Sequence, residues 1–423
     1  MTHHLDQDSP DLSPWIRSGD AVLWGQANAE PLPLTCALMA QRGRIGRFRV
    51  LLGIASSDPC RAEHADYVDF VSYGGSGANR KLADAGVLDV WPCHYSQLPA
   101  LIREGSLKVD VLLLQVAGPD EAGRYSLSLA HEYLLPALES ARVVIAEVNR
   151  QAPWVYGEQS FPLERFDAVL FSDRPLLEQI RAAPSSSDER LGRHIADFIE
   201  DGSTLQMGIG AIPEAVLGCL TGHRDLGVHS GSIGDGVAQL METGVITNAR
   251  KSIDAGKTVG GVLVGSAKLH RFVHRNPNVW MRSTDYVHNP DVLASIDRLV
   301  AINSAIEVDL TGQVNAEVAN GSYLGAVGGA GDFLRGAMRS RGGVPIIALP
   351  STSRTRSRIV ERLSGPVSTP RCDVGLVVTE FGVADLRGLS LKQRIKRMLD
   401  IAHPDFKAEL DRAASIRRVD RPI

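Results

Sequence analysis

Short apolar runs alternate with longer amphipathic segments along the first 180 residues of the chain. Each run holds four to seven apolar residues between turn or charged residues, as is typical of strands that are buried on both faces. The longer segments carry apolar residues three and four positions apart, as amphipathic helices do. This pattern indicates an α/β architecture with parallel sheets. It predicts strands at 47–55, 109–117, 141–148 and 166–172, and helices at 30–42, 96–105 and 131–141.

The alternation stops at a linker-like segment, RAAPSSSDERLG, and then resumes. Pro184 and three serines interrupt the periodicity, and Asp188 could cap a helix that begins near Glu189. We therefore predict an N-terminal α/β domain at 1–187 and a C-terminal α/β domain at 188–423. Two halves of similar size suggest a duplicated architecture with a ligand cleft between them. Strands of the second half are expected at 202–210, 225–231, 258–265, 299–310, 344–350 and 374–381.

Composition and charge narrow the class of protein. The 423 residues suit two domains of about 200 residues each. The 45 basic and 49 acidic residues are interspersed and give a net charge of −4, which argues against nucleic acid or an anionic membrane as a partner. No apolar run approaches the roughly 20 residues that span a bilayer. Five scattered cysteines without a CxxC pair, and a polar N-terminal segment, predict a cytoplasmic protein without a metal.

One glycine-rich loop could contact a ligand through its backbone. Gly325, Gly328 and Gly329 cluster just before a helix that is expected to start near Asp332. Glycines at this density let backbone N–H groups approach a phosphate or a developing oxyanion closely. The spacing fits neither a phosphate-binding GxxxxGK[ST] loop nor a GxGxxG dinucleotide turn, and a flexible surface loop is the competing interpretation.

A basic segment, PSTSRTRSRIV, offers a second candidate contact. On an extended backbone, Arg354, Arg356 and Arg358 would place three guanidinium groups on one side, where they could bind phosphates. A solvated charged face is an equally simple interpretation.

Ten ordered motifs give the chain a resemblance to a known family. Roughly residues 14 to 410 resemble the acetyl-CoA hydrolase/transferase family, whose members include 4-hydroxybutyrate and butyrate:acetate CoA-transferases. The motifs are WGQANAEPLPL, YGGSGANRKL, DVLLLQVAGPDEAGRYSLS, IAEVNRQAP, QMGIGAIPEAV, GVITN, INSAIEVDLTGQVNAE, AVGGAGDFLRGA, VVTEFGVADLRG and IAHPDF.

The resemblance implies a fold, a reaction and several site residues. It implies two CoA-transferase-type (NagB/RpiA-like) open-sheet domains with the active site between them. In the family, a glutamate attacks the acyl-CoA thioester, and an enzyme-bound glutamyl–CoA thioester then forms and passes CoA to a carboxylate. The glycine loop, here Gly325, Gly328 and Gly329, would contact CoA and the oxyanion. Asn289 corresponds to a family asparagine that would touch the thioester or the pantetheine of CoA. Glu380 corresponds to a family glutamate near the cleft, and a role in holding the following loop in place is the competing interpretation.

The chain departs from the family at the nucleophile. Family members read HSE or HTE at this strand end, followed shortly by a DG pair, and here the segment is HSGSIGDG. His229 and Ser230 match, Asp235 and Gly236 match, and Gly231 stands where the glutamate is expected. Space is therefore expected beside the thioester, and the sequence shows no replacement nucleophile.

Three functional hypotheses follow from this departure. The first is hydrolysis of an acyl-CoA, or acyl transfer to another small acceptor, without a glutamyl–CoA intermediate. The second is an ordinary CoA-transferase that acts between an acyl-CoA and a small carboxylate through a different acid. The third is a non-catalytic CoA-binding or scaffold subunit. In each, coenzyme A enters as part of the substrate rather than as a resident cofactor, and we expect a homo-oligomer such as a homodimer.

Overall fold

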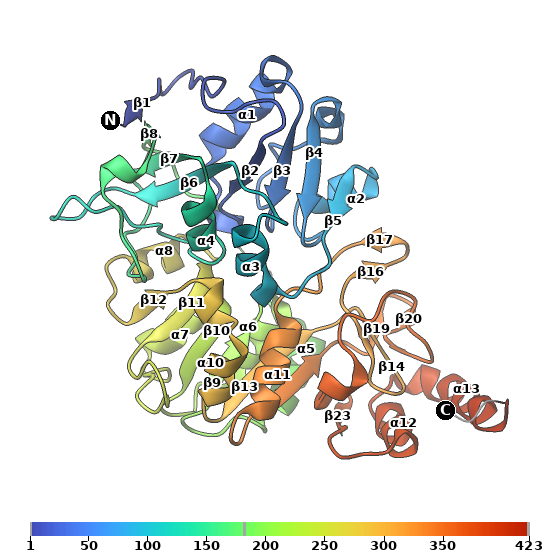
Figure 1. Ribbon diagram of the computed structural model, residues 1–423. Helices are drawn as coiled ribbons and strands as arrows, with labels where there is room; N and C mark the ends of the chain where they lie inside the picture. Colours follow the sequence, from blue (N-terminus) through green and yellow to red (C-terminus); the bar gives the residue numbers. More distant parts are fainter. Residues whose placement is uncertain (1, 181–182, 421–423) are drawn as a thin grey trace.

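A computed structural model of the chain, which describes residues 2–180 and 183–420, contains two large open sheets (Figure 1). The first sheet has eight parallel strands in the order β1-β8-β7-β6-β2-β3-β4-β5. They are β1 (His3–His4), β2 (Ala21–Trp24), β3 (Phe48–Leu52), β4 (Val68–Ser72), β5 (Leu88–Val90), β6 (Val111–Ala117), β7 (Val143–Asn149) and β8 (Ala168–Ser172).

Helices connect these strands and cover the sheet. Buried runs such as VLLLQVA in β6 and VVIAEVN in β7 form the middle of the sheet because both of its faces are covered. The helices are α1 (Leu32–Ile45), α2 (Asn79–Asp84), α3 (Leu98–Arg103) and α4 (Leu134–Ser140). Short 3-10 turns lie at Ala27–Ala29, Ala62–Asp66, Tyr95–Gln97 and Leu163–Arg165.

The second sheet also has eight strands, in the order β12-β11-β10-β9-β13-β18-β22-β23. Its strands are parallel except for β23, which pairs antiparallel with β22. They are β9 (Thr204–Met207), β10 (Gly227–Ile233), β11 (Thr258–Leu263), β12 (Val279–Met281), β13 (Leu299–Ser304), β18 (Val344–Ala348), β22 (Leu376–Thr379) and β23 (Gly382–Asp385).

Helices and small sheets complete the second half. The helices are α5 (Ser186–Ala196), α6 (Ala211–Cys219), α7 (Asp235–Glu242), α8 (Ala267–Val273), α9 (Thr284–Val287), α10 (Pro290–Ser295), α11 (Ala330–Arg339), α12 (Leu391–Asp400) and α13 (Pro404–Asp420). The small sheets use β14 (Glu307–Asp309), β15 (Val314–Asn315), β16 (Val318–Ala319), β17 (Ser322–Tyr323), β19 (Thr352–Ser353), β20 (Arg356–Ser357) and β21 (Ile359–Val360). A 3-10 turn lies at Arg371–Asp373.

The two sheets share one topology. In each, a central strand (β2 or β9) is flanked on one side by the next three strands in sequence and on the other side by three later strands of the sheet, and an eighth strand (β1 or β23) completes that edge. β3 and β10 are therefore equivalent strands. The largest hydrophobic cluster contains residues of both sheets, such as Leu112 and Val228, so the halves pack directly against each other.

The predicted fold class is confirmed, with local corrections. The predicted strand at 299–310 divides into β13 and β14, and β14 leaves the main sheet to pair with β15 and β21. Asp188 is not the cap of α5: Ser185 caps the helix, and Asp188 completes a capping box three residues later. The first residues of α5 extend across the predicted boundary at 187/188, which stays a prediction.

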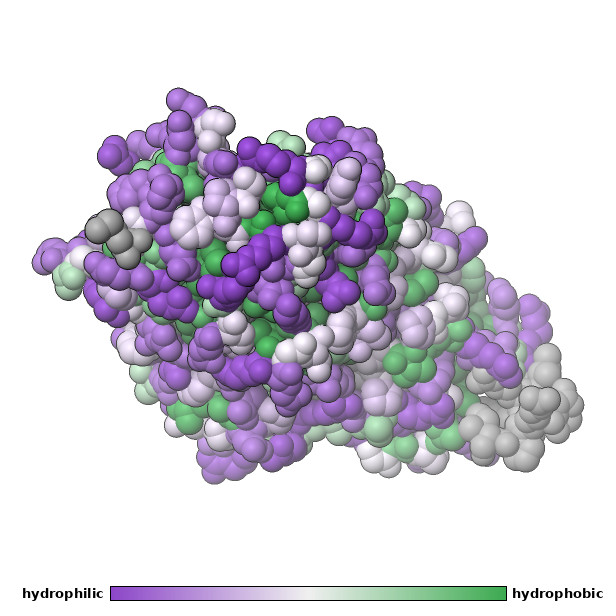
Figure 2. All heavy atoms as spheres, turned by 45° about the horizontal axis from the view of Figure 1, so that its top comes forward, coloured by the Kyte–Doolittle hydropathy of each residue, from purple (hydrophilic) through white to green (hydrophobic). Residues whose placement is uncertain are grey.

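The surface is mainly hydrophilic on the face that Figure 2 shows, and hydrophobic side chains appear between the hydrophilic ones in separate areas. Among the described residues, no helix has the length and apolar character needed to cross a bilayer.

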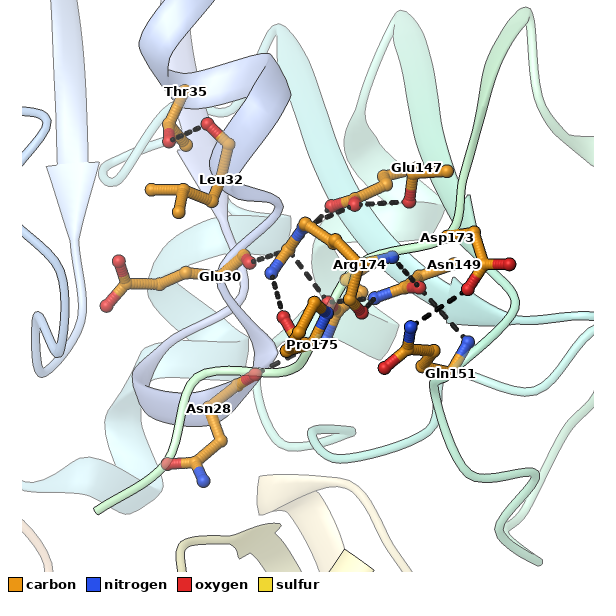
Figure 3. A network of polar contacts seen from close by, with 12 residues as sticks. Asn28, Glu30, Leu32, Thr35, Glu147, Asn149, Gln151, Asp173, Arg174 and Pro175 are labelled. Atoms are coloured by element: carbon orange, nitrogen blue, oxygen red, sulfur yellow. Dashed lines mark hydrogen bonds and ion pairs between the residues drawn. The ribbon is translucent and has the colours of Figure 1, made fainter. Parts of the chain in front are cut away.

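An ion pair links β7 to the segment that follows β8 in the N-terminal half (Figure 3). The guanidinium group of Arg174 donates to both carboxylate oxygens of Glu147, through Nε at 2.7 Å and Nη2 at 2.9 Å. The same Nη2 donates to the backbone oxygen of Glu30 at 3.0 Å and to the side chain of Gln115 at 2.9 Å. Glu147 is completely buried, and this network supplies it with a counter-charge.

Candidate active site

A cavity of about 210 Å³ lies where the two sheets meet. Carboxyl ends of parallel strands in open α/β sheets are the usual place for a ligand. Here the segments that follow β2, β3 and β4 face the ends of β9, β10 and β13 across the cavity. The lining residues are Gln26, Ile54, Tyr73, Ser76, Tyr95, Glu132, Gln206, Met207, Gly208, Gly231, Ser232, Val262, His288, Asn303, Ala326, Gly328, Gly329, Ala330 and Phe333.

Gly231 lies on β10 and forms part of the cavity wall. The side chains of the two preceding residues point in opposite directions and are held by hydrogen bonds. Ser230 Oγ donates to the backbone oxygen of Met207 at 2.8 Å, and the ring of His229 bonds the backbone oxygen of Val287 at 3.1 Å. Burial lowers the pKa of His229 to about 3, so its ring is neutral at pH 7. These two side chains hold the strand in place and do not form a nucleophile–base pair.

The space expected beside residue 231 is narrowed by His288. A Cβ atom on Gly231 would lie 3.0 Å from His288 Nε2, and one on Gly329 would lie 2.8 Å from the same atom. The imidazole packs between the rings of Tyr95 (tilted) and Phe333 (edge-to-face), with ring centroids 4.7 and 4.8 Å away. Burial lowers its pKa to about 3. A neutral aromatic ring thus occupies part of the volume that a side chain at position 231 would need.

The glycine-rich loop reaches the cavity through two of its three predicted residues. Gly328, with a φ of +55°, accepts a hydrogen bond from the backbone N–H of Tyr95 at 3.0 Å, and Gly329 is the N-cap of α11. Both line the cavity together with the first turn of α11.

Gly325, the third predicted glycine, does not line the cavity. Its carbonyl accepts from the N–H of Gly75 at 2.9 Å, and a side chain at 325 would collide with the backbone oxygen of Ala316.

Asn289 and Glu380 do not line the cavity, and both have partners elsewhere. Asn289 is the N-cap of α10, and its side-chain oxygen accepts from the N–H of Asp291 at 2.9 Å. Glu380 accepts from the N–H and the hydroxyl of Ser351 at 2.8 and 2.7 Å and so holds the loop after β18. Their predicted catalytic roles stay predictions.

The basic segment is a hairpin rather than an extended run, which corrects its predicted geometry. β19 and β20 pair antiparallel, and Arg354 lies in the turn between them with a φ of +54°. Arg356 donates to Asn320 Oδ1 at 2.7 Å. Burial lowers the pKa of Arg358, which is less exposed than the other two arginines. The three guanidinium groups therefore do not form one row along a strand, and their contact with CoA stays a prediction.

Glu132 is the carboxylate in the cavity wall, and sequence reasoning missed it. The segment 131–141 was expected to be helical throughout, but α4 begins only at Leu134. Glu132 is 2 % exposed, and Gln26 Nε2 donates to its Oε2 at 2.6 Å. Burial raises the pKa of Glu132 to about 8, while hydrogen bonds from Tyr95 and Gln26 limit the rise. At pH 7 this carboxyl group is mostly protonated.

Comparison with known proteins identifies the family. Residues 7–178 match the model of the acetyl-CoA hydrolase/transferase N-terminal domain, and residues 265–414 match that of the C-terminal domain. Gly231 lies in the segment between the two matches. The chain is 43% identical over 401 residues to a 4-hydroxybutyrate coenzyme A transferase of Clostridium kluyveri, covering 93% of this chain and 94% of that protein.

Solved structures agree with the sequence match. RipA of Yersinia pestis superposes with a TM-score of 0.92 at 35% identity, covering 98% of this chain and 97% of that one. A 4-hydroxybutyrate CoA-transferase of Porphyromonas gingivalis superposes with a TM-score of 0.84 at 35% identity, covering 99% and 98%. The chain therefore belongs to the acetyl-CoA hydrolase/transferase family.

Proposed function

We propose that this chain cleaves an acyl-CoA thioester in the cavity between its sheets and passes the acyl group to water or to another small acceptor. No glutamyl–CoA intermediate forms at position 231. The observation that carries this proposal is the missing side chain at position 231 of β10, because a glycine cannot act as a nucleophile. The neighbouring Ser230 and His229 are engaged in buried hydrogen bonds.

The cavity has suitable groups for such a reaction. A volume of about 210 Å³ holds the thioester end of a substrate together with a water molecule, whose share of liquid volume is about 30 Å³. The loop at Gly328 and Gly329 leads into α11, whose N-terminus carries a partial positive charge. We assign oxyanion stabilisation to backbone N–H groups of this loop. Arg354 and Arg356 are the proposed contacts for the phosphates of CoA.

The wild-type protein tests the reaction directly. Release of free thiol from a panel of acyl-CoA thioesters should proceed without added carboxylate, and treatment with borohydride or hydroxylamine should trap no enzyme–CoA adduct. An adduct at any glutamate would overturn the proposal. Binding of CoA without any thioester cleavage would favour the non-catalytic subunit instead.

Restoring the family residue gives a second test. The substitution Gly231→Glu should introduce exchange of label between acyl-CoA and free acetate, at a rate about tenfold or more above wild type, because it adds a carboxylate nucleophile. Since the new Cβ would lie 3.0 Å from His288 Nε2, the double variant Gly231→Glu with His288→Ala provides the needed space. Gly208→Glu is the matched control. Gly208 also lines the cavity, with no atom within 4 Å of its added Cβ, and this variant should gain no exchange.

A CoA-transferase that uses a different acid is the second candidate, because the carboxyl group of Glu132 lies in the same cavity wall. It predicts label exchange with carboxylates in the wild-type protein and a covalent CoA adduct on Glu132. The absence of exchange across a broad panel of carboxylates would exclude it.

A further inference from the structure

Glu132 reaches the cavity through an unusual pairing between the two halves of the molecule. The backbone from Leu129 to Glu132 belongs to the N-terminal half, yet it runs along β11 of the second sheet. Leu263 donates to Leu129 at 2.8 Å, and the N–H of His131 donates to the backbone oxygen of Gly261 at 3.0 Å. The N–H of Thr284 then donates to the backbone oxygen of Glu132 at 3.2 Å. These bonds fix the position of Glu132 relative to the C-terminal half.

The backbone at Glu132 is in an unfavourable conformation. Its φ is +30°, a value that residues with a side chain rarely adopt. Such conformations are costly and concentrate at functional sites, where the surrounding structure maintains them. The pairing with β11 supplies that support here.

Glu132 lies beside the bare position on β10. A Cβ atom on Gly261 would lie 3.0 Å from the backbone oxygen of Gly231 and 3.1 Å from Glu132 Cγ, so both approach Gly261 closely. The absence of a side chain at 261 lets the segments that carry Gly231 and Glu132 pack this closely, and both residues line the cavity. A substrate carbonyl placed against Gly231 would therefore lie next to the Glu132 carboxyl group.

The surroundings of Glu132 hold no described cation that acts on its ionisation. Its hydrogen-bond donors are Gln26 and Tyr95. Gln26 is itself fixed, because its Oε1 accepts from the N–H of Ile54 at 2.8 Å and from the hydroxyl of Tyr73 at 2.7 Å.

The other titratable groups near Glu132 are neutral at pH 7. Burial raises the pKa of three tyrosines and lowers the pKa of two histidines: Tyr73, Tyr95, Tyr133, His131 and His288. A buried carboxyl group without a counter-charge is expensive to keep for stability alone.

We propose that Glu132 is the general base of thioester cleavage, an assignment that rests on the function proposed above. The carboxylate of Glu132 takes a proton from a water molecule while the water oxygen bonds to the carbonyl carbon beside Gly231. When the tetrahedral intermediate collapses, the carbon–sulfur bond breaks and Glu132 returns the proton to the CoA sulfur. The products are the free acid and the CoA thiol, and no bond forms between enzyme and substrate.

The ionisation of Glu132 fits this role. A general base works best when its pKa is near the working pH, and the raised value of about 8 meets this condition. Because the base must be ionised in the free enzyme, kcat/KM should rise with pH and level off above about 8.

The test compares the wild-type protein with Glu132→Gln and Glu132→Asp. We expect Glu132→Gln to lower kcat/KM by about 10²–10⁴-fold and to abolish the rise near pH 8, while the affinity for CoA stays within about twofold. Glu132→Asp keeps a carboxylate and should retain a pH-dependent rise with a smaller loss of rate. Glu307→Gln is the matched control: Glu307 is also buried, but it bonds Asn315 and Ser364 outside the cavity. Its pH profile should equal that of wild type.

A single turnover in ¹⁸O-labelled water separates base from nucleophile. Label should appear in the product acid and not in the protein. A CoA or acyl adduct on Glu132, or label in its carboxylate, would overturn the general-base role and identify Glu132 as a nucleophile. A Glu132→Gln variant with wild-type rate and pH profile would overturn only the assignment of Glu132. A wild-type protein that binds CoA but cleaves no thioester would overturn the proposed function and the base role together.

Discussion

Glu147 and Glu132 are two buried glutamates of the same half of the molecule, and their surroundings are opposite. Glu147 receives two hydrogen bonds from the guanidinium group of Arg174 (Figure 3). It accepts another from the hydroxyl of Ser172 at 2.6 Å. Glu132 receives hydrogen bonds from neutral partners, and burial raises its pKa to about 8. One carboxylate has a guanidinium group as its counter-charge, whereas no cation among the described residues acts on the other.

This difference distinguishes a carboxylate that stabilises the fold from one that can take part in a reaction. A carboxylate paired as Glu147 is has its position fixed by its cationic partner. An unpaired carboxyl group that borders a cavity can exchange a proton at a pH near its raised pKa. Glu147 is enclosed by the network around Arg174, whereas Glu132 lines the cavity together with Gly231. The contrast predicts which substitution should damage stability and which should damage activity.

Breaking the ion pair should give the largest loss of stability. Arg174→Met leaves a fully buried carboxylate without its counter-charge, which costs about 3–5 kcal/mol in free energy of unfolding. Denaturant titration measures this loss. The double variant Arg174→Met with Glu147→Gln removes both charges and should recover part of it. A loss below about 1 kcal/mol for the single variant would mean that the pair is solvated and that the contrast with Glu132 is false.

Glu132→Gln should instead gain stability relative to wild type as the pH rises. The folded-state pKa of Glu132, about 8, lies above its ordinary value of 4.5, so the native state holds a proton that the unfolded state has lost between these pH values. Wild-type stability therefore falls as pH rises through this window, while the amide does not titrate. We expect the difference in free energy of unfolding between variant and wild type to grow by a few kcal/mol between pH 5 and pH 9. Thermal unfolding at pH 5, 7 and 9 measures it, and a pH-independent difference would contradict the raised pKa.

The sequence predicted the parts of this molecule that depend on local pattern. Buried apolar runs identified strands such as β6, β7 and β8, because both faces of a parallel strand are covered and the run itself is the signal. The family motif around Gly231 drew attention to the end of β10, where the cavity lies.

The remaining features depend on contacts between distant segments. Gln26 and Glu132 are 106 positions apart, and the segment that carries Glu132 is fixed by β11, which lies about as far again along the chain. The periodicity of the sequence does not predict the pairing of the Glu132 segment with β11, because periodicity reflects local structure only. The arginine hairpin was missed for a different reason. Alternating residues from Ser353 to Arg358 suit a strand, whereas the positive φ at Arg354 turns the chain back on itself.

A neutral hydrogen-bond donor should lower the pKa of Glu132 less than an arginine would, and substitution of Gln26 measures the size of this effect. Gln26→Leu removes the donor that lies 2.6 Å from Glu132 Oε2 and favours the ionised form, so the pKa of Glu132 should rise further. We expect the rise of kcat/KM with pH to move upward by about one pH unit, equivalent to about 1.4 kcal/mol. Tyr73→Phe is the matched control, because it removes a bond at 2.7 Å to Gln26 Oε1 but leaves Gln26 held by Ile54 and still donating to Glu132. Its pH profile should shift by less than half as much. If both variants shift equally or neither shifts, the titrating group in the cavity is not Glu132, and its contrast with Glu147 is one of packing alone.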